Sequence, residues 1–577
     1  MKNVIKCLNE YKVQTILAPL FKMLEAIFEL LVPLVVTSLI DIGIRQQDKQ
    51  YIWKMCVLLV TFAMVGFLLS VIAQYFSAKA AMGVGTTLRS QVFRKVQYLS
   101  FEQLDTVGTS TLINYIIGDI NLVQTGVNLF LRLFLRAPFI VIGATVMAFR
   151  IDSKITIIFI ISTILVITII FMIIKKTIIS YKKAQERLDA LALLIRENYT
   201  GARLIRAFNR QTDEQEEFNE NNQKYTKMQV LAGRISALMN PSTFVVMNAA
   251  IILILYVAGP SVGKGILTQG QVVALVNYLM QILLAIVILA ALIIAVARAG
   301  ASAIRLGSVL DMSLREEVAE QELGVEDESG ICFKNVSFCY DKDSEAQVDD
   351  LTFSIPRKST IGIIGGTGAG KSTLVNLIPR FYDASAGQVY IDGVNVQQMP
   401  TASLRSKIGL VPQDATLFKG TLRDNLRWGK EDATDEEMYK ALEVAQATSI
   451  VEQNEDGLDM KIEQGGRNVS GGQRQRLSIA RAIIGRPEIL ILDDSGSALD
   501  YITEAKMRKE LREYTKENIV VIVSQRVSSI QETDNILVLD DGKLVGEGTH
   551  QELLKSNEVY REIYESQSNS TTKRREK

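Results

Sequence analysis

The stretch Ile361–Thr373, which reads IGIIGGTGAGKST, decides the fold of the C-terminal half of the chain. Its apolar start predicts a buried strand, its glycines predict a tight turn, and Lys371 begins a predicted helix. This arrangement fits the pattern G-x-x-x-x-G-K-[ST], in which bare backbone amides at a helix N-terminus surround phosphate groups. We expect Lys371 to reach the β- and γ-phosphates and the Ser372 hydroxyl to bind Mg²⁺. The predicted triphosphate-binding residues are Gly365, Gly366, Thr367, Gly368, Ala369, Gly370, Lys371, Ser372 and Thr373.

Two further stretches of the C-terminal half indicate phosphate chemistry. The apolar run Ile489–Asp494 predicts a strand that leads to Asp493, a position suited to holding Mg²⁺ beside the phosphates. The stretch Ser470–Gln473, SGGQ, predicts exposed amides at the start of another helix. One domain cannot easily bring both helix starts to one nucleotide, whereas two copies that face head to tail can. The sequence therefore predicts a site shared between two chains.

The N-terminal half has the composition of a membrane domain. The chain has 577 residues, too many for one compact domain, and its zero net charge gives no sign of nucleic-acid binding. A membrane span needs about 20 apolar residues. Candidate spans lie near Leu17–Ile40, Met55–Ala78, Leu131–Phe149, Ile155–Ile174, Thr243–Gly259 and Val272–Val296. Basic residues concentrate in the long connection Lys175–Arg234, which places the long connections and the C-terminal half in the cytoplasm.

Ionisable residues interrupt the predicted spans. Glu25 and Glu29 lie on one helix face, and Arg132 and Arg136 share that spacing where the third span begins. These residues either pair between helices, for example Glu29 with an arginine, or form a polar lining that favours cationic amphiphiles. The sequence leaves both interpretations open.

Over nearly its whole length the chain resembles a half-transporter of the ATP-binding-cassette (ABC) exporter family. The resemblance implies an α-helical membrane domain of six long transmembrane helices, the type I exporter fold, fused to an α/β P-loop nucleotide-binding domain. In this chain the membrane domain spans residues 1–312, an acidic linker spans 313–330, and the nucleotide-binding domain spans 331–577. Two connections, with turns at Gly108 and Gly201, resemble the coupling helices of the family.

The family pattern also implies roles for individual residues. Tyr340 matches the aromatic residue that stacks on adenine, and Gln413 matches the Q-loop glutamine that senses Mg²⁺. Asp500 belongs to the D-loop. Ser470, Gly471, Gly472 and Gln473 match the signature that completes the ATP site of the other chain. The implied Mg²⁺-side residues are Ser372, Gln413 and Asp493.

Two positions depart from the family pattern. The residue after Asp493 is normally a glutamate, the catalytic base, and here it is Asp494, whose carboxylate lies one methylene closer to the backbone. A misplacement of about 1 Å can reduce a rate on the order of 100-fold. The switch position normally carries histidine, and here it is Gln525, which can hydrogen-bond a phosphate but cannot hold a proton near pH 7. Together these changes predict a degenerate ATP site that hydrolyses weakly.

This pattern is similar to heterodimeric multidrug exporters of bacteria. It implies ATP-driven export of small amphiphilic molecules by alternating access across the plasma membrane, in a multi-pass protein with a cytoplasmic nucleotide-binding domain. The implied cofactors are ATP and Mg²⁺. The implied partners are a second half-transporter chain with the competent glutamate and histidine, membrane lipid and a small-molecule substrate, with no nucleic acid. The alternatives are a homodimeric exporter of lipid or peptide and a regulatory ATP-binding subunit that gates rather than pumps.

Overall fold

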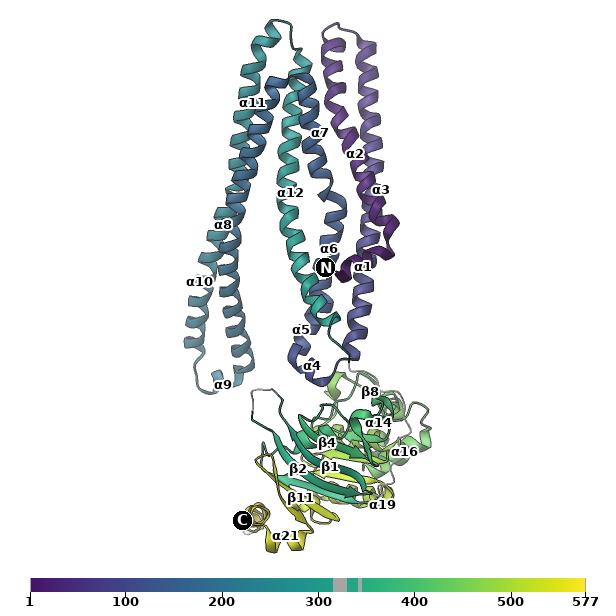
Figure 1. Ribbon diagram of the computed structural model, residues 1–577. Coiled ribbons are helices and arrows are strands. Elements are labelled where there is room, and N and C mark those ends of the chain that lie inside the picture. The colour runs from purple at the N-terminus through teal and green to yellow at the C-terminus, as the bar shows by residue number, and fades with distance from the viewer. Residues whose placement is uncertain (1, 315–328, 341–344, 576–577) are drawn as a thin grey trace. The chain divides into compact units, whose positions relative to one another are not determined.

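The computed structural model describes residues 2–314, 329–340 and 345–575, and its internal contacts divide the chain into two units (Figure 1). The membrane unit comprises Met1–Gln97 with Gly108–Ser313. The C-terminal unit comprises Leu314–Lys577 together with Tyr98–Val107. The short segment Tyr98–Val107 therefore groups with the C-terminal half of the chain rather than with the long helices that flank it.

Within the described residues, six helical spans of the membrane unit are long and apolar enough to cross a membrane, which confirms the predicted number. The helices of the membrane unit are α1 (Lys2–Glu10), α2 (Lys12–Ser38), η1 (Leu39–Ile44), α3 (Lys49–Gln97), α5 (Thr109–Asn114), η2 (Tyr115–Asp119), α6 (Ile120–Leu129), η3 (Phe130–Phe134), α7 (Arg136–Ile151), α8 (Ser153–Thr200), α9 (Ala202–Ala207), α10 (Gln211–Ala237), α11 (Met239–Gly263) and α12 (Gln269–Leu310). At about 1.5 Å per residue, α3 and α8 extend well beyond the roughly 30 Å of bilayer hydrocarbon.

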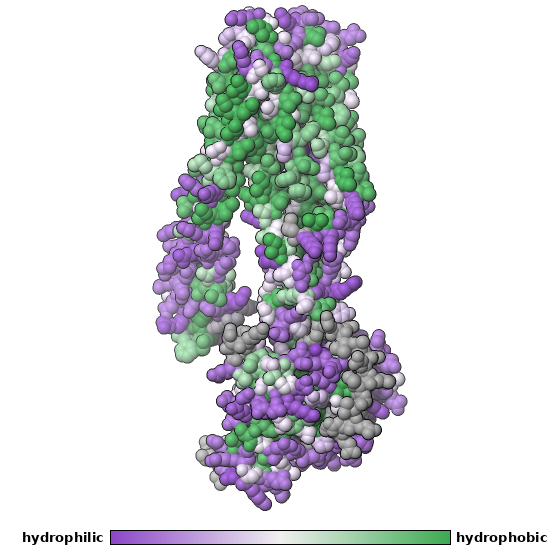
Figure 2. Space-filling view, in the orientation of Figure 1, coloured by the Kyte–Doolittle hydropathy of each residue, from purple (hydrophilic) through white to green (hydrophobic). Residues whose placement is uncertain are grey.

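Apolar side chains remain exposed along the membrane helices. On α8, the residues Ile157, Ile160, Ile161 and Ile164 all have more than a third of their surface exposed. Figure 2 shows the resulting band of apolar side chains over the membrane unit. A contiguous apolar surface of this kind is unfavourable in water and favourable in lipid.

The helix α2 contains Pro33 and receives hydrogen bonds from α12 near that residue. Because proline has no N–H group, the carbonyl oxygen of Glu29 loses its usual helical partner. Gln281 Nε2 donates a hydrogen bond to that oxygen at 3.3 Å, and Tyr278 Oη donates to the carbonyl oxygen of Leu30 at 2.8 Å. An unpaired backbone group in hydrocarbon costs several kcal/mol, so these bonds from α12 stabilise α2 around Pro33.

The glutamates inside the first span each have a basic partner. Lys22 Nζ lies 2.5 Å from Glu25 Oε2 on the same helix. Arg136 Nη2 of α7 lies 2.6 Å from Glu29 Oε2 of α2. The expected pairing of Glu29 with an arginine is therefore confirmed. Because both carboxylates are neutralised locally, these contacts give no support to a lining that selects cations.

The pairing of Glu29 with Arg136 predicts the stability of single and double variants. Glu29→Gln leaves the Arg136 cation without a partner inside a span, and we expect it to destabilise the protein by about 2 kcal/mol, less than the roughly 3–5 kcal/mol of a fully buried pair. The double variant Glu29→Gln/Arg136→Gln should be more stable than Glu29→Gln alone, as measured by thermal unfolding in lipid nanodiscs.

The exposed pair Glu220–Lys224 on α10 offers a matched control. Glu220→Gln should leave the stability nearly unchanged, since surface ion pairs contribute little. A double Glu29/Arg136 variant that is less stable than both single variants would contradict the pairing.

The C-terminal unit is built on a six-stranded sheet in the order β12-β11-β3-β10-β9-β6 and a four-stranded sheet in the order β2-β1-β4-β5. The strands are β1 (Ser329–Phe338), β2 (Val348–Pro356), β3 (Thr360–Gly365), β4 (Ala386–Ile391), β5 (Val394–Asn395), β6 (Ile408–Val411), β7 (Gly420–Thr421), β8 (Lys461–Ile462), β9 (Ile489–Asp493), β10 (Ile519–Val523), β11 (Asn535–Asp540) and β12 (Lys543–Gly548). The helices are α4 (Phe101–Val107), α13 (Lys371–Leu377), η4 (Val396–Gln398), α14 (Thr401–Ser406), α15 (Leu422–Arg427), α16 (Asp435–Val444), α17 (Thr448–Glu452), η5 (Gly457–Asp459), η6 (Gln464–Gly466), α18 (Gly471–Ile483), α19 (Tyr501–Tyr514), α20 (Val527–Ile530), α21 (His550–Ser556) and α22 (Glu558–Arg575).

The strands β3, β10 and β9 are parallel neighbours, and their shared direction positions the site. Val523 of β10 pairs with Ile363 of β3 on one side and with Asp493 of β9 on the other. The chain segments that follow these strands therefore leave the sheet at the same edge. In open α/β sheets, ligands bind at the carboxyl ends of parallel strands.

Candidate functional site

The glycine-rich loop between β3 and α13 leaves its backbone accessible. Gly368 and Gly370 adopt φ values of 86° and 88°, which residues with a side chain rarely adopt. A Cβ atom built on Gly366 or Gly368 would have no other atom within 4 Å, whereas one built on Gly370 would lie 2.3 Å from the carbonyl oxygen of Gln347. The loop is thus tightly packed at its helix end and open at its middle, where backbone N–H groups are accessible to an anion.

Lys371 is held against this loop. Its Nζ atom donates hydrogen bonds to the carbonyl oxygens of Gly365 and Gly366, at 2.9 and 2.6 Å. Burial lowers the pKa of Lys371, and the nearby carboxylates of Asp494 and Asp493 oppose that shift. A buried ammonium group on a flexible side chain is suited to binding phosphate oxygens.

Ser372 and Asp493 bring two oxygen ligands together from different elements. Ser372 Oγ, in the first turn of α13, donates a hydrogen bond to Asp493 Oδ1 at the end of β9, at 3.2 Å. Burial raises the pKa of Asp493, and the hydrogen bond from Ser372 opposes the shift. Hydroxyl and carboxylate oxygens are the ligands that Mg²⁺ prefers. This donor set fits Mg²⁺ and identifies the residues of this chain that would hold the ion.

A cavity of about 250 Å³ opens beside the loop. It is lined by Gln347, Thr367, Gly368, Ala369, Gly370, Lys371, Ser372, Thr373, Gln413, Asp493, Asp494, Val523 and Gln525. The structure thus brings most of the predicted site residues to one place. Sequence reasoning missed Gln347 and Val523. No motif marks either residue, because Gln347 packs on Gly370 through its backbone carbonyl and Val523 is an ordinary strand residue.

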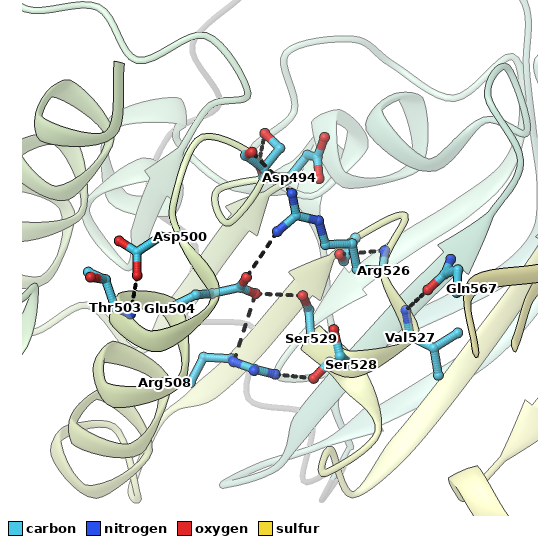
Figure 3. Close-up of polar contacts among 12 residues, drawn as sticks. Asp494, Asp500, Thr503, Glu504, Arg508, Arg526, Val527, Ser528, Ser529 and Gln567 are labelled. Carbon is cyan, nitrogen blue, oxygen red and sulfur yellow. Dashed lines mark hydrogen bonds and ion pairs between the residues drawn. The ribbon is translucent and has the colours of Figure 1, made fainter. Parts of the chain in front are cut away.

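Asp494 follows the end of β9, Gln525 lies just beyond the end of the adjacent strand β10, and both residues line this cavity. The backbone N–H group of Asp494 donates to the carbonyl oxygen of Val523 at 3.0 Å, and its φ of 46° turns the chain sharply out of β9. Burial raises the pKa of Asp494, and the cations Arg526 and Lys371 oppose the shift. Figure 3 shows the Arg526 guanidinium group between Asp494 and Glu504.

Some predicted residues lie outside this cavity and have local roles. Ser470 and Gln473 form a capping box at the start of α18, where Ser470 Oγ accepts from the Gln473 N–H group and Gln473 Oε1 accepts from the Ser470 N–H group. Asp500 caps α19 by accepting from the Thr503 N–H group at 3.0 Å. Tyr340 Oη lies 3.2 Å from the hydroxyl of Thr373, next to the loop. The stretch Ser470–Gln473 therefore presents a capped helix start that does not line this chain's own cavity.

The segment α4 contacts the C-terminal unit through aromatic residues. The rings of Phe101 and Phe381 stack with centroids 4.4 Å apart, and Tyr382 Oη donates to Asp105 Oδ2 at 2.6 Å. Burial and the hydrogen bond to Asp105 raise the pKa of Tyr382. On α9, by contrast, Leu204 is 62% exposed. The connection that carries α4 is thus attached to the C-terminal unit through its own side chains.

A P-loop nucleotide-binding domain joined to six membrane-spanning helices is the organisation of an ATP-driven membrane transporter. Residues 15–305 match the ABC transporter transmembrane region, and residues 348–497 match the ABC transporter domain. The chain is 33% identical over 98% of both sequences to YfiB of Bacillus subtilis, an ABC transporter ATP-binding protein. It is 29% identical, over 98% of each sequence, to a putative export ATP-binding/permease protein of Rickettsia felis. Its fold is similar to a solved bacterial Atm1-family ABC exporter with ATP bound, with a TM-score of 0.81, 23% identity and coverage of 97% of this chain and 98% of the other.

The chain belongs to the ABC transporter family, as a half-transporter with the exporter fold. It is a multi-pass protein of the plasma membrane, and its nucleotide-binding domain follows the membrane domain on the cytoplasmic side. ABC exporters act as dimers, and the ATP-binding domain couples ATP hydrolysis to transport.

The raised pKa of Asp494 predicts a pH-dependent stability difference. Since the folded state holds the proton of this carboxyl group more tightly than the unfolded state does, the ionised group destabilises the fold as the pH rises. We expect Asp494→Asn to raise the melting temperature of the nucleotide-free protein at pH 7. The gain should shrink as the pH falls toward about 4, the ordinary pKa of aspartate. Melting curves between about pH 4 and 8 test this.

Asp456→Asn, an exposed position before η5, is the matched control and should show no comparable gain. A constant difference between Asp494→Asn and the unmodified chain across the pH range would contradict the electrostatic explanation.

Proposed function

We propose that this chain is the degenerate-site subunit of a heterodimeric ABC exporter that moves small amphiphilic molecules out of the cell. In this proposal residues 1–312 form half of the export path, residues 313–330 are a linker, and residues 331–577 bind ATP. The observation that carries it is the combination of complete binding elements with altered residues at the base and switch positions of one cavity.

The binding elements support ATP and Mg²⁺ at this chain's own site. The open loop, Lys371 and the pair Ser372–Asp493 supply donors for phosphate and ligands for Mg²⁺. Gln413 lines the same cavity, which supports its assignment as the residue that senses the ion. Tyr340 lies beside the loop through its contact with Thr373, a place suited to stacking on adenine.

The hydrolytic elements support slow turnover at this site. Asp494 follows β9 directly, so its short side chain keeps the carboxylate close to the edge of the sheet. Gln525 lines the cavity at the switch position, where a histidine could gain and lose a proton and a glutamine cannot. We assign weak base activity to Asp494 and phosphate contact to Gln525. The competent site in this proposal is built on a partner's loop, glutamate and histidine, and the capped helix start Ser470–Gln473 of this chain completes it, with Asp500 in the adjoining D-loop.

The membrane unit supports a cargo of small amphiphiles rather than of simple cations. Glu25 and Glu29 each pair with a basic side chain, so these two carboxylates do not present free negative charge. Leu204 and Phe208 at the tip between α8 and α10 are 62% and 71% exposed, which suits docking on a partner's nucleotide-binding domain. ATP must favour the closed, outward-facing state for its binding to drive alternating access.

The proposal is tested by the ATPase activity of the reconstituted pair. The chain is purified together with the half-transporter chain that copurifies with it, and the two base positions are changed separately. Neutralising the partner's glutamate should reduce turnover by at least about 100-fold, the scale of a lost or misplaced catalytic group. Asp494→Asn in this chain should change turnover by less than about twofold.

The homodimeric alternative gives the opposite result. Brisk ATP hydrolysis and transport by this chain alone in vesicles, abolished by Asp494→Asn, would exclude the degenerate assignment. Lys371→Ala serves as the control that nucleotide binding at this site matters, because it removes the phosphate-binding cation in either case.

A further inference from the structure

The switch segment Ser524–Val527 connects β10 to α20 and carries Gln525 into the cavity. Its first residue is fixed to the sheet, because the Ser524 N–H group donates to the carbonyl oxygen of Ile363 at 3.0 Å. Beyond that point the segment leaves regular structure. The position of the Gln525 side chain therefore depends on what holds the backbone between Gln525 and Val527.

The C-terminal helix α22 provides that contact through one side chain. Gln567 Nε2 donates a hydrogen bond to the carbonyl oxygen of Gln525 at 2.7 Å. Gln567 Oε1 accepts one from the Val527 N–H group at 2.9 Å (Figure 3). The Val527 N–H group begins α20 and has no partner within that helix. One planar amide thus binds the backbone on both sides of Arg526.

The side chain between these two contacts is anchored as well. Arg526 Nη1 donates to Glu504 Oε2 and Arg526 Nη2 donates to the carbonyl oxygen of Ser497, both at 3.3 Å. Glu504 is only 2% exposed, and its other oxygen accepts from Ser529 Oγ at 2.5 Å. Two helices therefore hold the switch segment (Figure 3). Glu504 of α19 binds the Arg526 side chain of the segment, and Gln567 of α22 binds the backbone of the segment.

The helix α22 is itself firmly packed about two turns before Gln567. Tyr560 is fully buried in a cluster with Val527 and Ile530, and its hydroxyl lies 2.7 Å from His550 Nδ1. Burial raises the pKa of Tyr560 to about 12, so this hydroxyl stays protonated. The location of Gln567 is thus set by the core of the C-terminal unit.

We propose that Gln567 is a positioning residue of the ATP site, which holds the backbone of the switch segment so that Gln525 faces the γ-phosphate. This inference rests on the proposed function, in which Gln525 contacts the γ-phosphate and the loop contacts the remaining phosphates. It follows that the C-terminal helix contributes to the discrimination between a triphosphate and a diphosphate. Loss of the Gln567 amide should weaken binding of the triphosphate and leave the diphosphate unaffected.

The test measures binding of AMP-PNP and of ADP, each with Mg²⁺, to the full-length chain in lipid nanodiscs. We expect Gln567→Ala to weaken AMP-PNP binding about fivefold, the size of one lost side-chain hydrogen bond, with ADP binding unchanged. Gln567→Glu should show at least the same loss, because a carboxylate cannot donate to the carbonyl oxygen of Gln525. Gln525→Ala should also weaken AMP-PNP alone, and the double variant Gln525→Ala/Gln567→Ala should show no additional loss.

Ser566→Ala is the matched control, since Ser566 Oγ donates to the carbonyl oxygen of Ile563 within its own helix. It should leave both affinities unchanged.

Equal weakening of AMP-PNP binding and ADP binding by Gln567→Ala, or additive losses in the double variant, would overturn the positioning role. If Gln525→Ala has no effect on AMP-PNP, the proposed contact of Gln525 with the γ-phosphate is wrong. If Gln525→Ala weakens AMP-PNP and Gln567→Ala does not, only the role of Gln567 is wrong.

Discussion

The parallel pairing of β3 with β10 and of β10 with β9 is the constraint on which the site depends. Three strands that run the same way must end at one edge, so the glycine-rich loop, Asp494 and Gln525 meet there although more than a hundred residues separate the loop from Asp494. Nearly continuous apolar residues in each strand make this pairing stable, because both faces of the central sheet are covered. The packing of apolar strand residues thus determines where the polar residues of the site lie.

In the membrane unit the corresponding constraint is the absence of water. Every polar group inside hydrocarbon needs a partner, and this requirement explains why Gln281 bonds to the carbonyl freed by Pro33 and why Glu29 pairs with Arg136. These contacts join α2 to α12 and to α7. A motion that separates these helices must break or exchange such bonds, so they favour movement of the helices as groups.

The segment α4 follows α3 and precedes α5 in the chain, but it belongs to the C-terminal unit. It is short and has no buried residue of its own, yet it groups with the C-terminal unit through Phe101 and Asp105. Stacked aromatic rings and a hydrogen bond form a contact that resists both sliding and separation. This contact attaches the segment between α3 and α5 to the C-terminal unit.

The amino-acid sequence by itself determined the class of the protein. The loop pattern at Gly365–Ser372, the apolar spans and the altered residues Asp494 and Gln525 are all local signals, because each depends on side-chain type and spacing along one segment. The tertiary structure alone decided which distant groups meet. The pairing of Arg136 with Glu29, the backbone contact of Gln347 with Gly370, and the bonds from Gln567 to the switch segment join residues that no periodicity relates. Such contacts depend on how whole elements pack, and a packed arrangement leaves no mark on the spacing of residues within a single segment.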